Sequence, residues 1–176
     1  MDIIIVIVAD IRILLKKLKG DEIMDIGSGQ GYPSSHLSNF HPYIFEFDGV
    51  KCYSMEGLLQ SFKFKNIEMQ QEVCKMVGKQ AKFKGKKKKW WKTQTLYWAG
   101  VEYKRDSKEY QELLDKAFEA LSKNASFKKT LLATGDAVLT HNIGKIKQSE
   151  TVLTRQEFCS RLMKIRDRLR SERDVI

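Results

Sequence analysis

The sequence predicts an α+β fold: a mostly helical single domain with a small antiparallel hairpin. Apolar residues at helical spacing dominate the chain, one hairpin signal stands among them, and no linker rich in Pro, Gly or Ser divides the 176 residues. A chain of this length is expected to form one domain with a substantial core. With 42% apolar residues and only two prolines, its composition is typical of a globular protein.

The hairpin is predicted where Asp48-Gly49, a two-residue turn signal, separates residues 43–47 from 50–53. Helices are expected over 55–66, 68–77, 107–122 and 126–133, the second of them ending at Gly78. Thr154 followed by Glu157 three residues later is typical of a capping box, which predicts the start of the last helix.

Residues 1–23 are expected to be an N-terminal extension, because Met24 opens MDIGSGQGYPSS and the domain is predicted to span 24–176. The apolar run 1–15 lacks the preceding basic residues and the cleavage site of a secretory signal. It is also too short and too charged for a bilayer span, so a buried strand or an appended helix fits better, and no membrane partner is expected.

The three cysteines, Cys52, Cys74 and Cys159, are far apart and form neither a CxxC motif nor a Cys/His cluster. We therefore expect buried free thiols in a reducing cytoplasm, with no zinc site and no disulfide framework.

A glycine-rich loop, Asp25 to Gly31, looks like the nucleotide-binding loop of α/β proteins. Such a loop needs a buried strand before it and a helix after it. Here the preceding LKKLKGDEIM makes a poor buried strand, and Pro33 with polar residues follows in place of a helix. This argues against a methyl-donor or dinucleotide site.

One helix is predicted to carry a polar site. Glu56, Gln60 and Lys63 stand at i, i+4 and i+7, so a carboxylate, an amide and an amine share one stripe. The apolar residues Leu58, Leu59 and Phe62 fall away from it and can enter a core. The plainer interpretation is an ordinary solvated helix face.

Basic charge is concentrated between Val73 and Val101, where there are nine lysines and no acidic residue, against a net charge of +10 for the whole chain. All three tryptophans lie in the same stretch. Lysine interleaved with aromatic residues suits phosphate neutralisation and base stacking, and the alternative is a solvated lysine loop beside core tryptophans. Lys79 and Lys82, just after Gly78, are better placed for a phosphate than the consecutive lysines 86–89.

In their order along the chain, these motifs resemble the NADAR superfamily of YbiA-like proteins over nearly all of residues 29–170. The similarity lies in five segments: PSSHLSNF (33–40), FDGVKCYSMEGLLQSFKF (47–64), GKQAK (78–82), LLATGDAVLTH (131–141) and EFCSRLMKIRDRL (157–169). Three positions depart from the pattern. Gly57 replaces a common His, Trp90-Trp91 an Asp-Trp pair, and His141 a common Glu.

The resemblance implies a hydrolase of N-glycosidic bonds that needs no cofactor. Its substrate would be an ADP-ribosyl or phosphoribosyl N-glycoside, such as ADP-ribosylated guanine in DNA or a ribosylamino-pyrimidine phosphate of riboflavin synthesis, and toxin–antitoxin or phage-defence settings are implied for the former. Such cleavage builds positive charge on the ribose. Glu56 is the catalytic candidate, since a carboxylate near C1′ stabilises that charge or activates water.

The resemblance also implies roles for the residues around Glu56. Gln60 and Lys63 would hold ribose hydroxyls or phosphate, Asn39 the ribose or the base, Trp90 or Trp91 would stack on the base, and Lys79 and Lys82 would meet phosphates. His141 is a further substrate-binding candidate, or a turn residue beside Gly144. Asn39 can equally cap a helix or bond its own backbone.

Two functions without hydrolysis remain open. A binding module could recognise ADP-ribose or a related nucleotide without turnover and would not need Glu56 as a reactive group. A nucleic-acid-binding protein could instead use the lysine segment 75–92, with affinity for unmodified DNA or RNA that falls steeply with salt. The same segment could hold a DNA strand for the enzyme.

Overall fold

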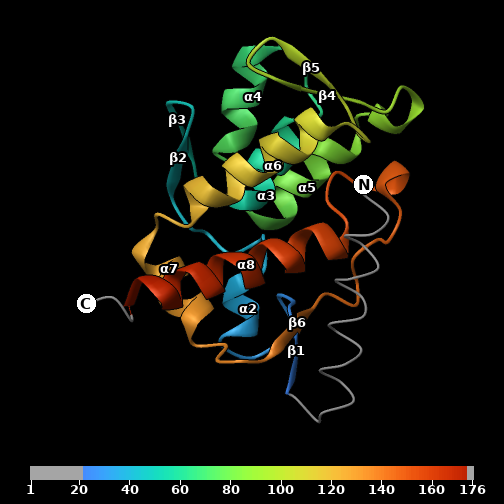
Figure 1. Cartoon of the computed structure of the whole chain (residues 1–176). Coiled ribbons are helices and arrows are strands. Elements are labelled where there is room, and N and C mark those ends of the chain that lie inside the picture. Colours follow the sequence, from blue (N-terminus) through green and yellow to red (C-terminus); the bar gives the residue numbers. More distant parts are fainter. Residues whose placement is uncertain (1–21, 174–176) are drawn as a thin grey trace.

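The computed structural model describes residues 22–173 and confirms the predicted α+β class. The expectations for residues 1–15 lie outside this range. Helices make up most of the regular structure, with three two-stranded sheets around them (Figure 1). The α-helices are α2 (Ser34–Leu37), α3 (Met55–Ser61), α4 (Ile67–Cys74), α5 (Gly78–Lys86), α6 (Lys108–Leu121), α7 (Ala125–Leu132) and α8 (Arg155–Arg173), and short 3₁₀ helices span Trp90–Lys92 and Gln148–Glu150.

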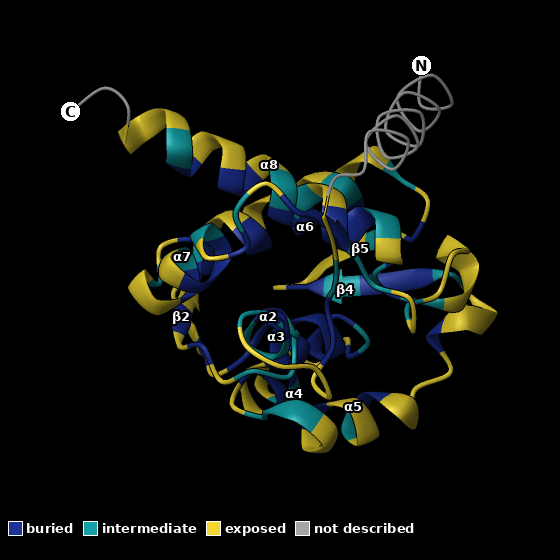
Figure 2. Cartoon of the chain, turned by 90° about the horizontal axis from the view of Figure 1, so that it is seen from below, coloured by how far each residue is buried: buried dark blue, intermediate teal, exposed yellow. Residues whose placement is uncertain are grey.

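Helix α3 is the central element. It packs against α4, α5 and α6, and Figure 2 shows it buried in the middle of the molecule. Every residue from Met55 to Ser61 is buried, the polar ones included. The Ser54 hydroxyl accepts the Gly57 amide and caps the helix. Helix α3 ends with Phe62 as its C-cap, which is earlier than the end of the helix predicted over 55–66. Lys63 therefore lies in the turn that follows the helix.

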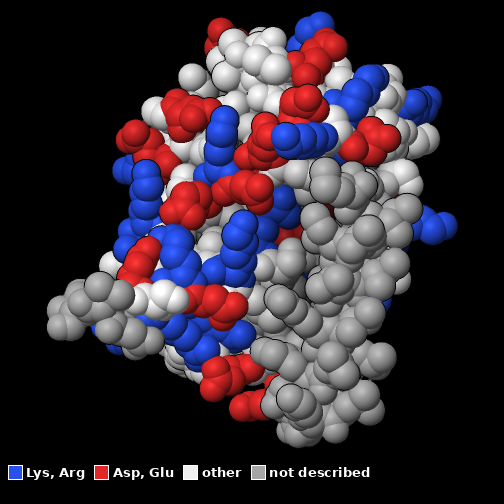
Figure 3. All heavy atoms as spheres, viewed as in Figure 1, with Lys and Arg blue, Asp and Glu red and all other residues white. Residues whose placement is uncertain are grey.

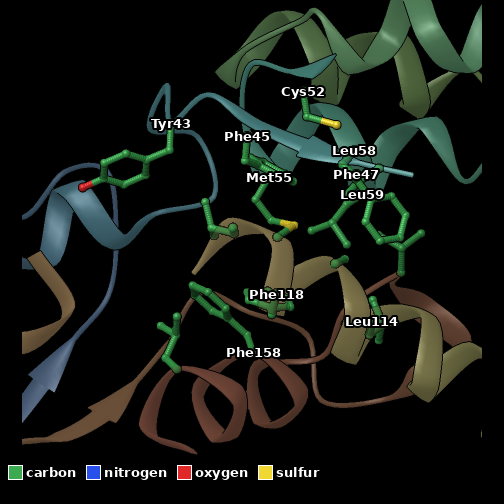
Figure 4. Close-up of a cluster of buried hydrophobic side chains, with 14 of the residues drawn as sticks. Tyr43, Phe45, Phe47, Cys52, Met55, Leu58, Leu59, Leu114, Phe118 and Phe158 are labelled. Atoms are coloured by element: carbon green, nitrogen blue, oxygen red, sulfur yellow. The ribbon is translucent and has the colours of Figure 1, made fainter. Parts of the chain in front are cut away.

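The hydrophobic core surrounds this helix on its apolar side. Leu58, Leu59 and Met55 meet aromatic residues of the first hairpin and of α6 and α8 in Figure 4. Leu58 and Phe62 are fully buried. Because the apolar side of α3 is packed in the core, the direction in which its opposite, polar side faces is also set.

Two hairpins are present among the described residues. The predicted one joins β2 (Phe45–Phe47) and β3 (Val50–Cys52), and positive φ angles at Asp48 and Gly49 (47° and 75°) match the expected turn. The second, β4 (Thr95–Trp98) with β5 (Val101–Lys104), was not predicted. Its turn places Ala99 at a φ of 48°, a conformation that alanine does not signal.

The segment before the glycine-rich loop corrects an expectation. Residues Ile23–Asp25 do form a strand, β1, which pairs in parallel with β6 (Val138–Thr140), and the one-turn helix α2 follows the loop. The two strands lie far apart in the sequence, so local patterning does not reveal the pair. This sheet has two strands only, so among residues 22–173 no larger parallel sheet supports the loop.

Gly78 has a different role from the one expected. Helix α4 already ends at Cys74, and Gly78, with a φ of 56°, is the first residue of the unpredicted helix α5. One side of α5, Ala81 and Gly85, is buried against α3, whereas its lysines are exposed or half-buried.

The capping box of α8 is confirmed and belongs to a larger network. The Thr154 amide donates to Glu157 Oε2, and the Glu157 amide donates to Thr154 Oγ1. The same carboxylate accepts two hydrogen bonds from the guanidinium of Arg105, which is 1% exposed. This buried ion pair fastens the start of α8 to the end of β5.

The face that carries α6 and α8 mixes basic and acidic side chains (Figure 3). Arg168 pairs with Glu119 there, and Arg161 pairs with Asp115. Between residues 22 and 173, no helix has both the length and the apolar character that crossing a membrane requires.

Candidate functional site

The polar side of α3 presents a buried carboxylate. Glu56 is 8% exposed, and its amide donates to the Asn39 carbonyl at 2.9 Å, which joins the first turn of α3 to the loop after α2. Its Oε1 accepts the side-chain amide of Gln60 at 2.9 Å. Within the described chain, Oε2 makes no hydrogen bond and is left for a ligand or a water molecule.

Gln60 is held by a close approach of α5. A Cβ added to Gly85 would lie 1.8 Å from Gln60 Oε1, so only glycine leaves room for the amide at this position. That oxygen is buried without a hydrogen-bond partner among the described residues, while the nitrogen of the same amide serves Glu56. The amide is thus oriented by packing toward the carboxylate.

Three basic side chains act electrostatically on Glu56. Burial raises the pKa of its carboxyl, and the Gln60 hydrogen bond opposes this rise. The charges of Lys82, Lys63 and His141 also act to lower this pKa. These three side chains, from α5, from the turn after α3 and from the end of β6, thus act on the charge of one carboxylate.

Lys63 is the most perturbed of the three. Burial lowers its pKa to about 8, with Glu56 opposing the shift and Lys82 adding to it. There is no direct ion pair between Lys63 and Glu56 among the residues described. A desolvated amine in a group of charges is typical of functional sites.

The start of α5 faces the loop that carries Asn39. Lys82 lies over the Phe40 ring at 5.6 Å, and a Cβ added to Gly78 would lie 3.7 Å from the same ring. No described side chain caps the first turn of α5, where Lys79 is exposed. Free amide groups and two lysines are suited to a phosphate.

Asn39 takes part through its backbone. Its carbonyl anchors Glu56, and its side chain makes no hydrogen bond within residues 22–173, so the helix-capping alternative is not what the structure shows. With His41, Tyr43 and Met55 it lines an internal cavity of about 10 Å³, too small for a sugar. A larger hollow of about 460 Å³, between the first hairpin and α6, contains none of the predicted site residues.

His141 lies at the end of β6 and is tied to β1. Its Nδ1 is 2.7 Å from the Ile26 carbonyl oxygen, and its ring meets Phe158 edge-on. The turn alternative also holds, because the Gly144 amide donates to the His141 carbonyl. The backbone of His141 thus closes a turn, while its ring contacts the Ile26 carbonyl.

The tryptophans separate into different environments. Trp90 is 8% exposed and belongs to the hydrophobic core, whereas Trp91 is 54% exposed with Lys92 over its ring. Trp98 is buried and donates to Asp48 Oδ2, which links the two hairpins. Of the predicted stacking pair, only Trp91 is therefore exposed.

The cysteines are buried free thiols, as predicted. Across residues 22–173, no group of three or more His, Cys, Asp or Glu side chains is arranged to hold a metal ion. Gly57 lies against α4, where a Cβ would be 2.6 Å from the Met76 carbonyl oxygen.

Three contributors to the site were not predicted: Phe40, Gly85 and Gly144. Phe40 was within reach, since it belongs to the segment 33–40 that carries the resemblance. The two glycines act by leaving space for Gln60 and for His141, and a single sequence does not show which side chain a glycine must accommodate.

Comparisons with known proteins agree with this architecture. Residues 31–167 match the family described as bacteriophage protein GP30.3. An uncharacterized 17.1 kDa protein in the Gp30-rIII intergenic region of Enterobacteria phage T4 is 36% identical over 151 residues, covering 83% of this chain and 98% of the phage protein. The NMR structure of the Escherichia coli protein YbiA superposes with a TM-score of 0.59 at 19% identity, over 87% of this chain and 88% of YbiA. The fold is thus that of YbiA, as the resemblance implied, and the chain belongs to the family of bacteriophage protein GP30.3.

Proposed function

We propose that the protein hydrolyses an N-glycosidic bond of an ADP-ribosyl or phosphoribosyl compound. The observation that carries the proposal is the buried Glu56 carboxylate with Oε2 unpartnered among the described residues, oriented by Gln60 and surrounded by Lys63, Lys82 and His141. A structural carboxylate would be paired on both oxygens, as Glu157 is. A half-free one, buried among positive groups, suits a ligand.

The chemistry follows from the charge that develops in the reaction. As the C1′–N bond breaks, the ribose gains positive charge, and a carboxylate close to C1′ stabilises it. Because burial raises the pKa of Glu56, this carboxyl is also a better proton acceptor than an exposed one. Glu56 would therefore take a proton from the attacking water while it stabilises the ribosyl cation.

The lysines support a phosphorylated substrate. Lys79 and Lys82 lie on the first turns of α5, beside the uncapped helix start. Lys82 is close enough to Glu56 to act on its charge, so a phosphate held there would place the attached ribose near the carboxylate. Both phosphoribosyl and ADP-ribosyl compounds carry a phosphate on the 5′ oxygen of the ribose whose C1′–N bond would be cleaved.

A nucleic-acid substrate has one specific observation in its favour. Lys86, the last residue of α5, and the following Lys87 to Lys89 are exposed, and the exposed Trp91 comes shortly after them. Lysines bind backbone phosphates and a free indole face stacks on a base. We therefore include ADP-ribosylated guanine in DNA as a substrate, with the segment 75–92 holding the strand.

The test compares the wild type with Glu56→Gln. Each is incubated with DNA that carries ADP-ribosylated guanine and with a ribosylamino-pyrimidine phosphate, and products are followed by mass spectrometry. Release of ADP-ribose with restored guanine, or of ribose phosphate, supports the hydrolase if Glu56→Gln abolishes it. Binding without turnover would favour the non-catalytic binding module for ADP-ribose or a related nucleotide. Salt-sensitive binding to unmodified strands alone would favour the nucleic-acid-binding alternative.

A further inference from the structure

We propose that the outer side of α5 binds single-stranded DNA, with the Phe83 ring stacked on a base and with Lys79 and Lys86 on backbone phosphates. The inference rests on the proposed function in one respect, because the bound strand is the one that carries the modified base. It adds a binding surface on the side of α5 that faces away from Glu56, and it selects a base in a strand over a free metabolite as the substrate.

The position of Phe83 in α5 sets the direction of its side chain. Ala81 and Gly85 are the buried residues of this helix, and Phe83 lies midway between them in the sequence. At 3.6 residues per turn, a residue midway between two residues four apart lies on the opposite side of the helix. Phe83 therefore faces away from α3, and it is 61% exposed. Figure 2 shows α5 at the edge of the molecule, with exposed residues along it.

Two lysines share this outer side of α5 with Phe83. Lys79 comes four residues before it and Lys86 three residues after it, which makes the three side chains neighbours in one stripe. Both lysines are exposed. Within the described chain, neither forms an ion pair with a carboxylate. The stripe thus presents an aromatic ring between two positive charges that no described carboxylate neutralises.

Packing inside the protein does not account for an aromatic residue at position 83. All nine phenylalanines of the chain lie within residues 22–173, and Phe83 is the one that is exposed. Its ring contacts no other aromatic ring of a described residue, and no described cation lies over it. A single exposed apolar side chain is ordinary on a protein surface, so the site is indicated by its place between the lysines and not by exposure alone.

A second exposed ring follows the stripe in the sequence. The exposed lysines 87–89 come after α5, and Trp91 beyond them is 54% exposed. The Trp91 carbonyl accepts the side-chain amide of Gln94 at 2.9 Å, and Trp90 anchors the same short 3₁₀ helix in the hydrophobic core. Because its backbone is held in this way, Trp91 loses little conformational freedom when a base stacks on it.

The alternation of lysines and aromatic rings fits an unpaired DNA strand. Lysines neutralise the backbone phosphates, and an aromatic ring can stack on any base. In a duplex, neighbouring base pairs cover both faces of each base, so only an unpaired base can stack on Phe83. The segment from Val73 to Val101 contains nine lysines and no acidic residue, so its charge is complementary to a polyanion over its whole length.

The stripe begins at the end of α5 that faces the candidate site. Lys79 lies in the first turn of this helix, and a Cβ at Gly78 would be 3.7 Å from the Phe40 ring. The residue before Phe40 is Asn39, whose carbonyl accepts the Glu56 amide at 2.9 Å. A strand bound along the stripe therefore reaches the loop beside the carboxylate, and the nucleotides that flank the modified one would occupy the stripe.

The binding test uses fluorescence anisotropy of a labelled, unmodified single-stranded oligothymidylate at several salt concentrations. We expect Phe83→Ala to raise the dissociation constant about 5- to 150-fold without changing the slope of log affinity against log salt. Phe83→Trp should bind at least as tightly as the wild type, whereas Phe83→Leu, which is apolar but has no aromatic face, should bind as weakly as Phe83→Ala. Lys79→Gln and Lys86→Gln should each reduce the slope by about 0.7. Ile44→Ala is the matched control, because Ile44 is 52% exposed and lies outside the lysine segment, and it should change neither quantity.

Three results would overturn stacking at Phe83: wild-type affinity of Phe83→Ala, tight binding by Phe83→Leu, or an equal loss of affinity for duplex DNA. On ADP-ribosylated guanine in single-stranded DNA, Phe83→Ala should raise KM with little change in kcat, and its kinetics on a free ribosylamino-pyrimidine phosphate should be those of the wild type. Turnover of the free metabolite alone would overturn the strand as substrate. Full activity of Glu56→Gln, or no turnover by the wild type, would instead overturn the proposed hydrolysis, and the anisotropy result would still decide whether α5 binds the strand.

Discussion

Replacing Gly85 with alanine is expected to reduce activity far more than stability. The new methyl group would lie 1.8 Å from Gln60 Oε1 and 2.8 Å from the amide carbon, so the amide must move away from its present position. The hydrogen bond from Gln60 Nε2 to Glu56 Oε1, 2.9 Å long, is then lost. The catalytic carboxylate would keep its burial but lose the group that orients it.

The expected changes in the free energy of unfolding and in kcat arise from different effects. Alanine stabilises a helix interior by about 1 kcal/mol relative to glycine, whereas overpacking costs roughly 1–3 kcal/mol, so the free energy of unfolding should fall by no more than about 2 kcal/mol. A hydrogen bond to a charged group contributes about 1.5–3 kcal/mol. If it acts in the transition state, its loss lowers kcat by roughly 10- to 150-fold.

The assay measures kcat on the cleaved N-glycoside together with urea unfolding of Gly85→Ala, Gln60→Ala and the double variant. Gly29→Ala is the control, because nothing lies within 4 Å of a Cβ at Gly29. If Gly85 acts through Gln60, the double variant should be no slower than Gln60→Ala alone. Wild-type activity in Gly85→Ala, or fully additive losses, would refute the reasoning.

Three further predictions concern stability. Burial lowers the pKa of Lys63 from 10.5 to about 8, so Lys63→Met should raise the free energy of unfolding at pH 7 by up to about 3 kcal/mol while lowering activity. In the wild type, the native state loses this proton before the unfolded state does. The free energy of unfolding measured in urea should therefore rise as the pH increases from about 8 to about 10.5. Gly57→Ala should lower the melting temperature by an amount equivalent to about 1–3 kcal/mol, because its Cβ would lie 2.6 Å from the Met76 oxygen; an unchanged value would contradict the packing. Arg105→Met should cost about 3–5 kcal/mol, because it leaves Glu157 buried with its charge unpaired. Arg105 lowers the pKa of Glu157 to about 2, so the stabilisation of the fold by the Arg105–Glu157 ion pair should be complete above about pH 4.5 and fade toward pH 2. If Arg105→Met left the midpoint of acid unfolding unchanged, the ion pair would not have this role.

Local signals made the first hairpin and most helices predictable. Asp48-Gly49 marks its own turn, Thr154 and Glu157 mark the start of α8, and the apolar spacing in 107–122 marks α6. These features depend on residues a few positions apart. For the same reason, the four-residue spacing of Glu56 and Gln60 was enough to place both on one side of a helix.

Long-range contacts explain what could not be predicted. Strand β1 forms because it pairs with β6, and the residues around Ile23 do not indicate that Val138 is its partner. Helix α5 contains two glycines and many lysines, and it is helical because Ala81 and Gly85 pack on α3. The position of His141 depends on the pairing of β6 with β1, so the sequence could name the residue without placing it.

The most direct test of the central claim is the rate of C1′–N bond cleavage by the wild type and by Glu56→Gln, measured by mass spectrometry on ADP-ribosylated guanine DNA and on a ribosylamino-pyrimidine phosphate. The account predicts turnover of at least one substrate by the wild type and loss of that turnover in a Glu56→Gln protein that still folds and still binds. Equal turnover by both proteins would contradict it, because the buried carboxylate at the centre of the site would then have no part in the chemistry.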